Sequence, residues 1–143
     1  MSISMNLTRL VLMISLATLI SACGTPGENR IVGSVLTGDE VKRLIGGNTI
    51  EGPAGGREYR WYYANNGNVT GVIGRADDDS GKWFIKGDNT YCHQWIDFFG
   101  GVEHCYQWYK RERSGRYVMV NVDTDRHANI EVWKVMQGNP LNM

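Results

Sequence analysis

The chain has 143 residues, of which 15 are Lys or Arg and 15 are Asp or Glu, so its formal net charge at pH 7 is zero. This length corresponds to one domain with a short additional segment. The balanced charge gives no sign of the basic face that nucleic-acid-binding proteins use, so we expect no nucleic-acid partner.

The first residues have the pattern of a bacterial export signal. Arg9 supplies a positive charge, and the apolar stretch 10–20 follows it directly. This stretch is too short for a helix that must cross about 30 Å of hydrocarbon, so we expect residues 1–22 to be a signal peptide that is removed. The run Ile20-Ser21-Ala22-Cys23 resembles the lipobox of bacterial lipoproteins, whose cysteine receives a diacylglycerol group.

This resemblance implies that Cys23 is the lipidation site and the first residue of a palmitate-bearing lipoprotein. The membrane is then a partner through the lipid anchor, because several acyl chains on one residue bind it stably. Gly24, in place of Asp, resembles the sorting signal for the outer membrane and implies a cell-envelope location that faces the periplasm. The alternative is an ordinary signal peptide, cut near Ala22, that leaves Cys23 as a free thiol.

The rest of the chain divides into a flexible tether over residues 23–36, which is mostly small, polar, Gly or Pro, and a single β-barrel-like domain over residues 37–143. A short helix opens the domain. Thr37 and Glu40 have the spacing of a capping box, and Gly46-Gly47 is expected to end the helix. Its apolar stripe consists of Val41, Leu44 and Ile45.

From Asn48 onward, apolar and polar residues alternate with the period of two that is typical of strands. The expected strands are Asn48–Gly52, Arg57–Ala64, Asn68–Arg75, Lys82–Lys86, Thr90–Asp97, Val102–Glu112, Arg116–Val122 and Ala128–Met136. Because the connections between them are short, neighbouring strands should pair antiparallel. The predicted fold class is all-β: about eight antiparallel strands in a small meander barrel, lipocalin-like in outline, with one short N-terminal helix and one disulfide. A sandwich is the alternative.

Cys92 and Cys105 lie on adjacent expected strands, and cysteines of exported proteins are usually oxidised. Pairing them directly places the centre of the hairpin between Phe98 and Phe99, where the Phe-Phe-Gly-Gly sequence indicates a turn. We therefore predict a disulfide between them. The alternatives are a metal-binding pair, which needs more ligands, and a catalytic thiol.

The same register puts His93 opposite His104 and Tyr91 opposite Tyr106. Because side chains alternate across a strand, one face of this hairpin collects a set of rings that forms a candidate ligand surface. Its members are Tyr91, His93, Trp95, His104, Tyr106 and Trp108. The alternative interpretation is a packed core wall whose histidines lie near the mouth of a barrel. We expect no metal, because the third ligand would have to be His127, the one histidine that remains.

The sequence contains neither a Gly-rich phosphate loop between a strand and a helix nor a G-x-S-x-G motif. We therefore predict no catalytic residues and no cofactor, and we expect that the protein is not an enzyme. The acidic run Asp77–Gly81 has oxygen ligands of the kind that Ca²⁺ prefers, but a solvated turn is the expected structure there.

The second half of the chain contains a set of short motifs. They are Gly81-Lys82-Trp83, Gly87-Asp88, Cys92, Trp95, Cys105-Tyr106 and Gly138-Asn139-Pro140-Leu141. In this pattern the chain resembles a family of small, uncharacterised exported bacterial proteins and lipoproteins. The resemblance implies an exported β domain with one internal disulfide, and it implies no particular activity.

Two further segments, Ser114-Gly115-Arg116-Tyr117 and Trp133-Lys134, resemble motifs of membrane-bound lysozyme inhibitors, although the cysteines are placed differently. We expect a lipid-anchored, non-catalytic binding module for a small or polymeric envelope ligand, with an inhibitor of that type as the alternative. The expectation rests on five tryptophans and seven tyrosines, because such rings favour positions with one wet end.

Overall fold

The computed structural model describes residues 33–123 and 128–143. The elements are β1 (Gly33–Val35), α1 (Gly38–Ile45), β2 (Asn48–Ala54), β3 (Arg57–Tyr63), β4 (Asn68–Ile73), β5 (Asp77–Lys86), β6 (Thr90–Trp95), the 3-10 turn η1 (Phe98–Gly101), β7 (Glu103–Arg111), β8 (Tyr117–Asn121), β9 (Ile130–Val132) and β10 (Lys134–Gln137). Within these ranges, no helix has both the length and the apolar character needed to cross a membrane. The expected signal peptide, Cys23 and residues 24–32 of the tether lie outside the described residues.

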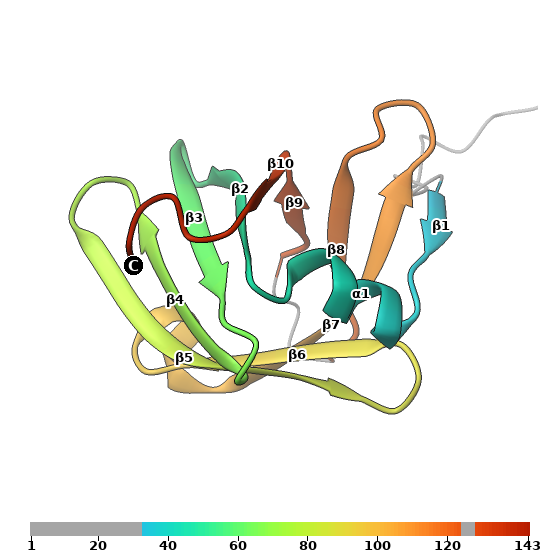
Figure 1. Ribbon diagram of the computed structural model, residues 1–143, viewed down its shortest axis with the longest axis horizontal. Coiled ribbons are helices and arrows are strands. Elements are labelled where there is room, and N and C mark those ends of the chain that lie inside the picture. Colours follow the sequence, from blue (N-terminus) through green and yellow to red (C-terminus); the bar gives the residue numbers. More distant parts are fainter. Residues whose placement is uncertain (1–32, 124–127) are drawn as a thin grey trace, which may run out of the picture. The chain divides into compact units, whose positions relative to one another are not determined.

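Antiparallel strands form one sheet that curls into a nearly closed barrel (Figure 1). From β2 to β8, each strand pairs with the next strand along the chain. The end of the chain then closes the ring, because β9 pairs with β8 while β10 pairs with β2. Between them, the amide of Trp133 donates to the carbonyl of Glu51 at 2.8 Å. Closure protects the strand edges, and the architecture confirms the predicted meander barrel.

The first strand corrects the boundary predicted for the tether. β1 pairs with β7 from Gly33 opposite Arg111 to Val35 opposite Tyr109, and Leu36 is buried with the core. The ladder between β6 and β7 stops at Tyr106, so the far half of β7 has backbone groups that β1 can satisfy. The segment expected to be a tether over residues 23–36 therefore ends before Gly33.

β5 begins earlier than the sequence predicts. The run Asp77–Gly81 is expected to be a turn, but it forms the first half of β5 and pairs with β4. The turn lies at residues 74–76 instead, where Gly74 has a φ of +71°. A polar strand forms here because Asp77 and Asp78 point to solvent and because the β4 ladder satisfies the backbone.

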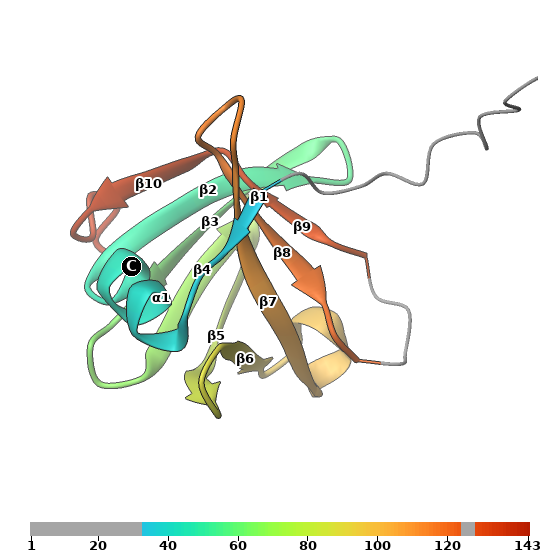
Figure 2. The same ribbon diagram turned by 90° about the vertical axis from the view of Figure 1, so that its right-hand side faces the viewer.

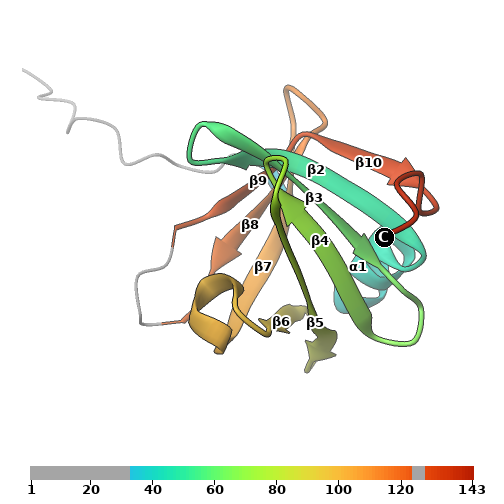
Figure 3. The ribbon, with the colours of Figure 1, turned by 90° about the vertical axis from the view of Figure 1, so that its left-hand side faces the viewer.

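The helix α1 covers one end of the barrel. The Thr37 hydroxyl accepts the Glu40 amide, and the Glu40 carboxylate accepts the Thr37 amide at 2.7 Å, which confirms the capping box. Val41 and Ile45 are fully buried against the barrel interior. Figures 2 and 3 show α1 and η1 at opposite ends of the barrel. The helix therefore covers the end that is remote from η1.

Large rings fill the interior, and glycines on neighbouring strands make room for them. A Cβ atom on Gly71 would lie 2.2 Å from Cδ1 of Trp61, and one on Gly52 would lie 2.7 Å from the Tyr59 ring. Alternation of small and large side chains is how a narrow barrel fills its lumen. These glycines are thus required for space, because any side chain there would displace a core ring.

The predicted disulfide joins β6 and β7. Cys92 and Cys105 are directly opposite each other, with Cα atoms 4.1 Å apart. Thirteen positions separate them in the sequence. The bond therefore holds together the hairpin that contributes all six candidate ligand-surface residues.

Replacement of both cysteines by alanine should lower the free energy of unfolding by about 3 kcal/mol, because the unfolded chain regains the entropy of the open loop. Urea denaturation with and without a reductant measures this difference. The reductant should destabilise the wild type and should leave the Cys92→Ala/Cys105→Ala variant unchanged. Equal stability of the oxidised and reduced wild type would contradict the prediction.

Candidate functional site

The hairpin of β6 and β7 has the register that the sequence predicts, with His93 opposite His104 and Tyr91 opposite Tyr106. The candidate ligand-surface residues therefore share one face, and this face points into the barrel. All are at most 2% exposed: Tyr91, His93, Trp95, His104, Tyr106 and Trp108. The structure brings the whole set together as a packed interior wall. Their role in ligand binding stays a prediction.

His93 lies in the middle of this wall and is surrounded by rings. Its ring centroid is 5.7 Å from that of Trp61 and 5.3 Å from that of Tyr106, both in edge-on arrangements. Phe99 covers it from the η1 side at 5.1 Å. Such edge and tilted contacts are the favourable ones for aromatic pairs, so the packing holds the imidazole in one orientation.

A chain of hydrogen bonds links His93 to two tyrosines. The Tyr91 hydroxyl donates to the Tyr63 hydroxyl at 3.0 Å and lies 3.0 Å from Nδ1 of His93. With the Tyr91 proton used in this way, Nδ1 of the neutral imidazole donates to Tyr91, and Nε2 is left as an acceptor. Within the described residues, Nε2 of His93 makes no hydrogen bond. Buried polar atoms without a partner are uncommon in folded proteins.

Three titratable groups of the interior, His93, Tyr63 and Tyr91, are uncharged at neutral pH. Burial, with a smaller effect of the neighbouring His104, lowers the pKa of His93 to about 3. Burial also raises the pKa of Tyr63 and of Tyr91 well above the ordinary value. Both tyrosines therefore stay protonated, and His93 stays neutral, so this part of the barrel offers hydrogen bonds without charge.

Phe99 has an unusual backbone conformation, with a φ of 54° in a residue that carries a Cβ. Several contacts enforce it. One Asp79 carboxylate oxygen accepts the amides of Asp97 and Phe98 at 2.9 and 2.7 Å, and His104 Nε2 lies 3.1 Å from the Phe99 carbonyl. Burial alone would raise the pKa of Asp79, but the amide hydrogen bonds outweigh it and lower the pKa. The turn thus holds the Phe99 ring over His93.

A hollow of about 460 Å³ opens at the η1 end of the barrel. We call it the aromatic cup. Its apolar lining includes Ala54, Tyr59, Trp61, Ile73, Phe99 and Ile130. The Tyr59 hydroxyl donates to the Glu131 carbonyl at 2.7 Å, so this tyrosine offers its ring to the cup. Phe99 and Trp61 line the cup and also contact His93, which is not itself a lining residue.

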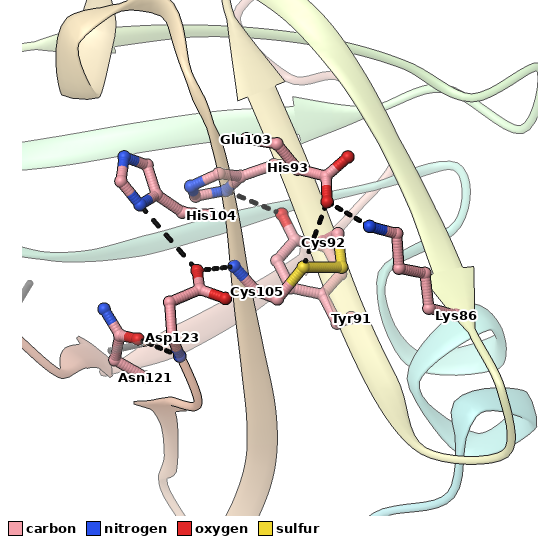
Figure 4. The surroundings of a disulfide bond; sticks show 9 residues. All are labelled: Lys86, Tyr91, Cys92, His93, Glu103, His104, Cys105, Asn121 and Asp123. Carbon is pink, nitrogen blue, oxygen red and sulfur yellow. Dashed lines mark hydrogen bonds and ion pairs between the residues drawn. A yellow bond between two sulfur atoms is a disulfide. The ribbon is translucent and has the colours of Figure 1, made fainter. Parts of the chain in front are cut away.

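The disulfide, whose surroundings are drawn in Figure 4, lies on the outer face of the same hairpin, because Cys92 and Cys105 alternate along their strands with the inward-facing rings. Glu103 forms an ion pair with Lys86, and its Oε1 lies 3.5 Å from Sγ of Cys105. Ligand atoms of Cys92, Glu103 and Cys105 lie within 4.8 Å of one another, the arrangement of a possible metal site. Both sulfurs are bonded to each other, and a disulfide sulfur is no thiolate ligand. The cluster therefore acts as a structural unit.

His104 is held between the interior and this outer cluster. Its Nδ1 lies 3.9 Å from Oδ2 of Asp123, and the same oxygen accepts the Cys105 amide at 2.7 Å (Figure 4). Asp123 thus contacts two consecutive residues of β7, His104 and Cys105. His127, which the sequence suggests as a possible third metal ligand, lies outside the described residues.

The sequence does not single out the residues that line the cup. Tyr59 and Trp61 come from β3, and their alternation with Tyr63 is visible in the sequence, but only barrel closure places them beside Phe99. Ser114-Gly115, part of the resemblance to lysozyme inhibitors, forms the exposed turn between β7 and β8. The residues of that resemblance are therefore separate from the cup.

Comparison of the chain with family models, with curated proteins and with solved structures gave no match.

The neutral state of buried His93 makes stability depend on pH. Its pKa falls from 6.5 to about 3 on folding, so in this window the unfolded chain binds more protons than the folded chain. The stabilisation is complete above pH 6.5 and is lost as the pH falls toward 3. A His93→Gln variant should therefore lose stability less steeply on acidification, by up to about 1.4 kcal/mol per pH unit.

Urea denaturation of both proteins at several pH values across this window measures the two slopes. The carboxylates contribute equally to both proteins, so the difference in slope isolates residue 93. Parallel curves for wild type and variant would contradict the assignment of a neutral, buried His93.

Proposed function

We propose that this protein is a lipid-anchored, non-catalytic binding module of the cell envelope, which holds a small, partly apolar ligand in the aromatic cup. The observation that carries the proposal is an apolar hollow of about 460 Å³ whose lining includes the rings of Tyr59, Trp61 and Phe99. Ligand sites are typically concave and apolar, with a few placed polar groups. The cup, which also has Arg57 and Asn129 in its lining, fits that description.

The shape of the site supports binding of a ring or a short aliphatic group. Tyr59 and Trp61 stack with their centroids 4.1 Å apart and form part of the floor, while Ile73 and Ile130 contribute to the wall. A ligand that settles there removes apolar area from water at about 25 cal/mol per Å². Arg57 and Asn129 also line the cup and can offer hydrogen bonds to a polar group of the ligand.

The chemistry of His93 favours binding over catalysis. An efficient general base has a pKa near the working pH, whereas the pKa of His93 is about 3. The imidazole is also fixed by Tyr91 and by ring packing. His93 is therefore unsuited to act as a general base.

Attachment to the membrane is supported by the leader sequence. The run Ile20-Ser21-Ala22-Cys23 follows a short apolar stretch, as in lipoprotein signals. Lipidation accounts for the third cysteine, because Cys92 and Cys105 pair with each other. The described domain begins at β1, so residues 24–32 separate it from the proposed anchor.

Filling the cup should abolish binding while leaving the barrel intact. Ala54→Phe adds a ring to the lining, and we expect it to weaken binding of the neutral dye N-phenyl-1-naphthylamine by about tenfold or more. Ser114→Phe adds the same ring to an exposed turn and should bind the dye like the wild type. Dye fluorescence titration measures the affinity, and circular dichroism checks the fold. If the wild type binds no dye, or if both variants bind equally well, the cup is not the site.

Lipidation at Cys23 can be tested independently of the ligand. In a Gram-negative host fed labelled palmitate, the wild type should carry the label and sediment with membranes, because the acyl chains supply stable anchoring. Cys23→Ala should lose both properties. The Cys92→Ala/Cys105→Ala variant is the matched control and should keep the label. Labelling of the Cys23→Ala variant would contradict the proposed anchor.

A further inference from the structure

The rim of the aromatic cup carries a positive charge. Arg57, at the start of β3, lines the cup, and it also lines a second hollow of about 750 Å³ outside the hairpin of β2 and β3. Arg75, in the turn between β4 and β5, lines the same outer hollow and is exposed. Arg57 is therefore the point at which the apolar cup meets a charged surface.

The arginines of this surface differ in the ion pairs that they form. Arg60 is held by Glu51 at 2.8 Å and lies 3.4 Å from Glu58. Arg57 pairs with Asp77, and both side chains of that pair are more than half exposed. Solvent-exposed ion pairs contribute little to stability, so Arg57 can exchange its partner at small cost.

Arg75 is even better placed than Arg57 to bind an anionic group of a ligand. Among the described residues it forms no ion pair. A guanidinium presents several N–H donors in a planar fork that matches carboxylate and phosphate groups. Arg57 and Arg75 together can therefore receive one anionic group at the rim of the cup.

The interior cannot take such a group. The buried polar side chains of the described residues are Thr49, His93 and His104, with no Lys or Arg among them. An anion placed there would lose its hydration without a cationic partner, which is strongly unfavourable. The apolar part of a ligand must therefore enter the cup, and an acidic part must remain at the arginine rim.

From this geometry we propose that the ligand of the aromatic cup is an anionic amphiphile, whose apolar body lies on Tyr59, Trp61 and Phe99 and whose carboxylate or phosphate binds Arg57 and Arg75. The inference rests on the proposed function and adds the chemical class of the ligand.

Competition against N-phenyl-1-naphthylamine tests the proposal with three probes that share one chain: 1-octanol, octanoate and octyl phosphate. The variant Arg57→Gln/Arg75→Gln removes both rim charges. Arg43→Gln, on the exposed face of α1 at the far end of the barrel, is the matched control. The quantity compared is the ratio of the octanol Kd to the Kd of each anion.

The double variant should lower this ratio about tenfold for at least one anion, as expected for the loss of charge-assisted hydrogen bonds, while octanol binding stays the same. The control should leave the ratio unchanged. A drop for octanoate alone identifies the carboxylate as the head group, and a drop for octyl phosphate alone identifies the phosphate. If the ratios of the double variant equal those of the wild type while octanol still displaces the dye, the rim inference is wrong and the proposed function stands. If the wild type binds neither the dye nor octanol, the proposed function itself fails.

Discussion

The direct pairing of Cys92 with Cys105 is the constraint on which the rest of the structure depends. Side chains alternate across a strand, so a slip of one residue in this register would turn every ring of β6 to the opposite face. The disulfide excludes that slip, because only directly opposite cysteines come this close. Tyr91, His93 and Trp95 are thereby committed to the interior. The hydrogen-bond chain through Tyr63 and the ring contacts of His93 follow from that commitment.

The two ends of the barrel are covered to different extents, and the proposed site lies at the less covered end. At one end, α1 buries Val41 and Ile45 against the core. At the other end, η1 contributes two rings. Phe98 packs against Trp95, and Phe99 is held in a left-handed conformation by the hydrogen bonds that Asp79 and His104 make around it. Backbone strain of this kind persists only where the surroundings enforce it. A cup remains beside Phe99, because these two rings leave part of that end of the barrel unfilled.

The interior and the rim differ in electrostatic character, which gives the proposed site a direction. Inside, a neutral imidazole and protonated tyrosines offer hydrogen bonds without charge. At the rim, the guanidinium groups of Arg57 and Arg75 are exposed to solvent. A ligand with one apolar and one acidic end would therefore bind in a single orientation. The disulfide cluster on the outer side of the hairpin has no part in this gradient.

The local features of this protein can be predicted from its amino-acid sequence. The capping box at Thr37, the hairpins, the strand order and the β6–β7 register all follow from short-range patterns, because turn chemistry and the period of two act between neighbours. The sequence does not predict β1 or the first half of β5. Both segments have a polar or Gly-rich composition that is unusual for strands, and they form strands because they pair with a neighbouring strand. Only the tertiary structure decided that the six rings of the β6–β7 hairpin are a packed wall and that the cup is lined by Tyr59, Trp61 and Phe99. Closure of the barrel brings these three together from distant strands, and no local pattern specifies how much of the lumen they leave unfilled.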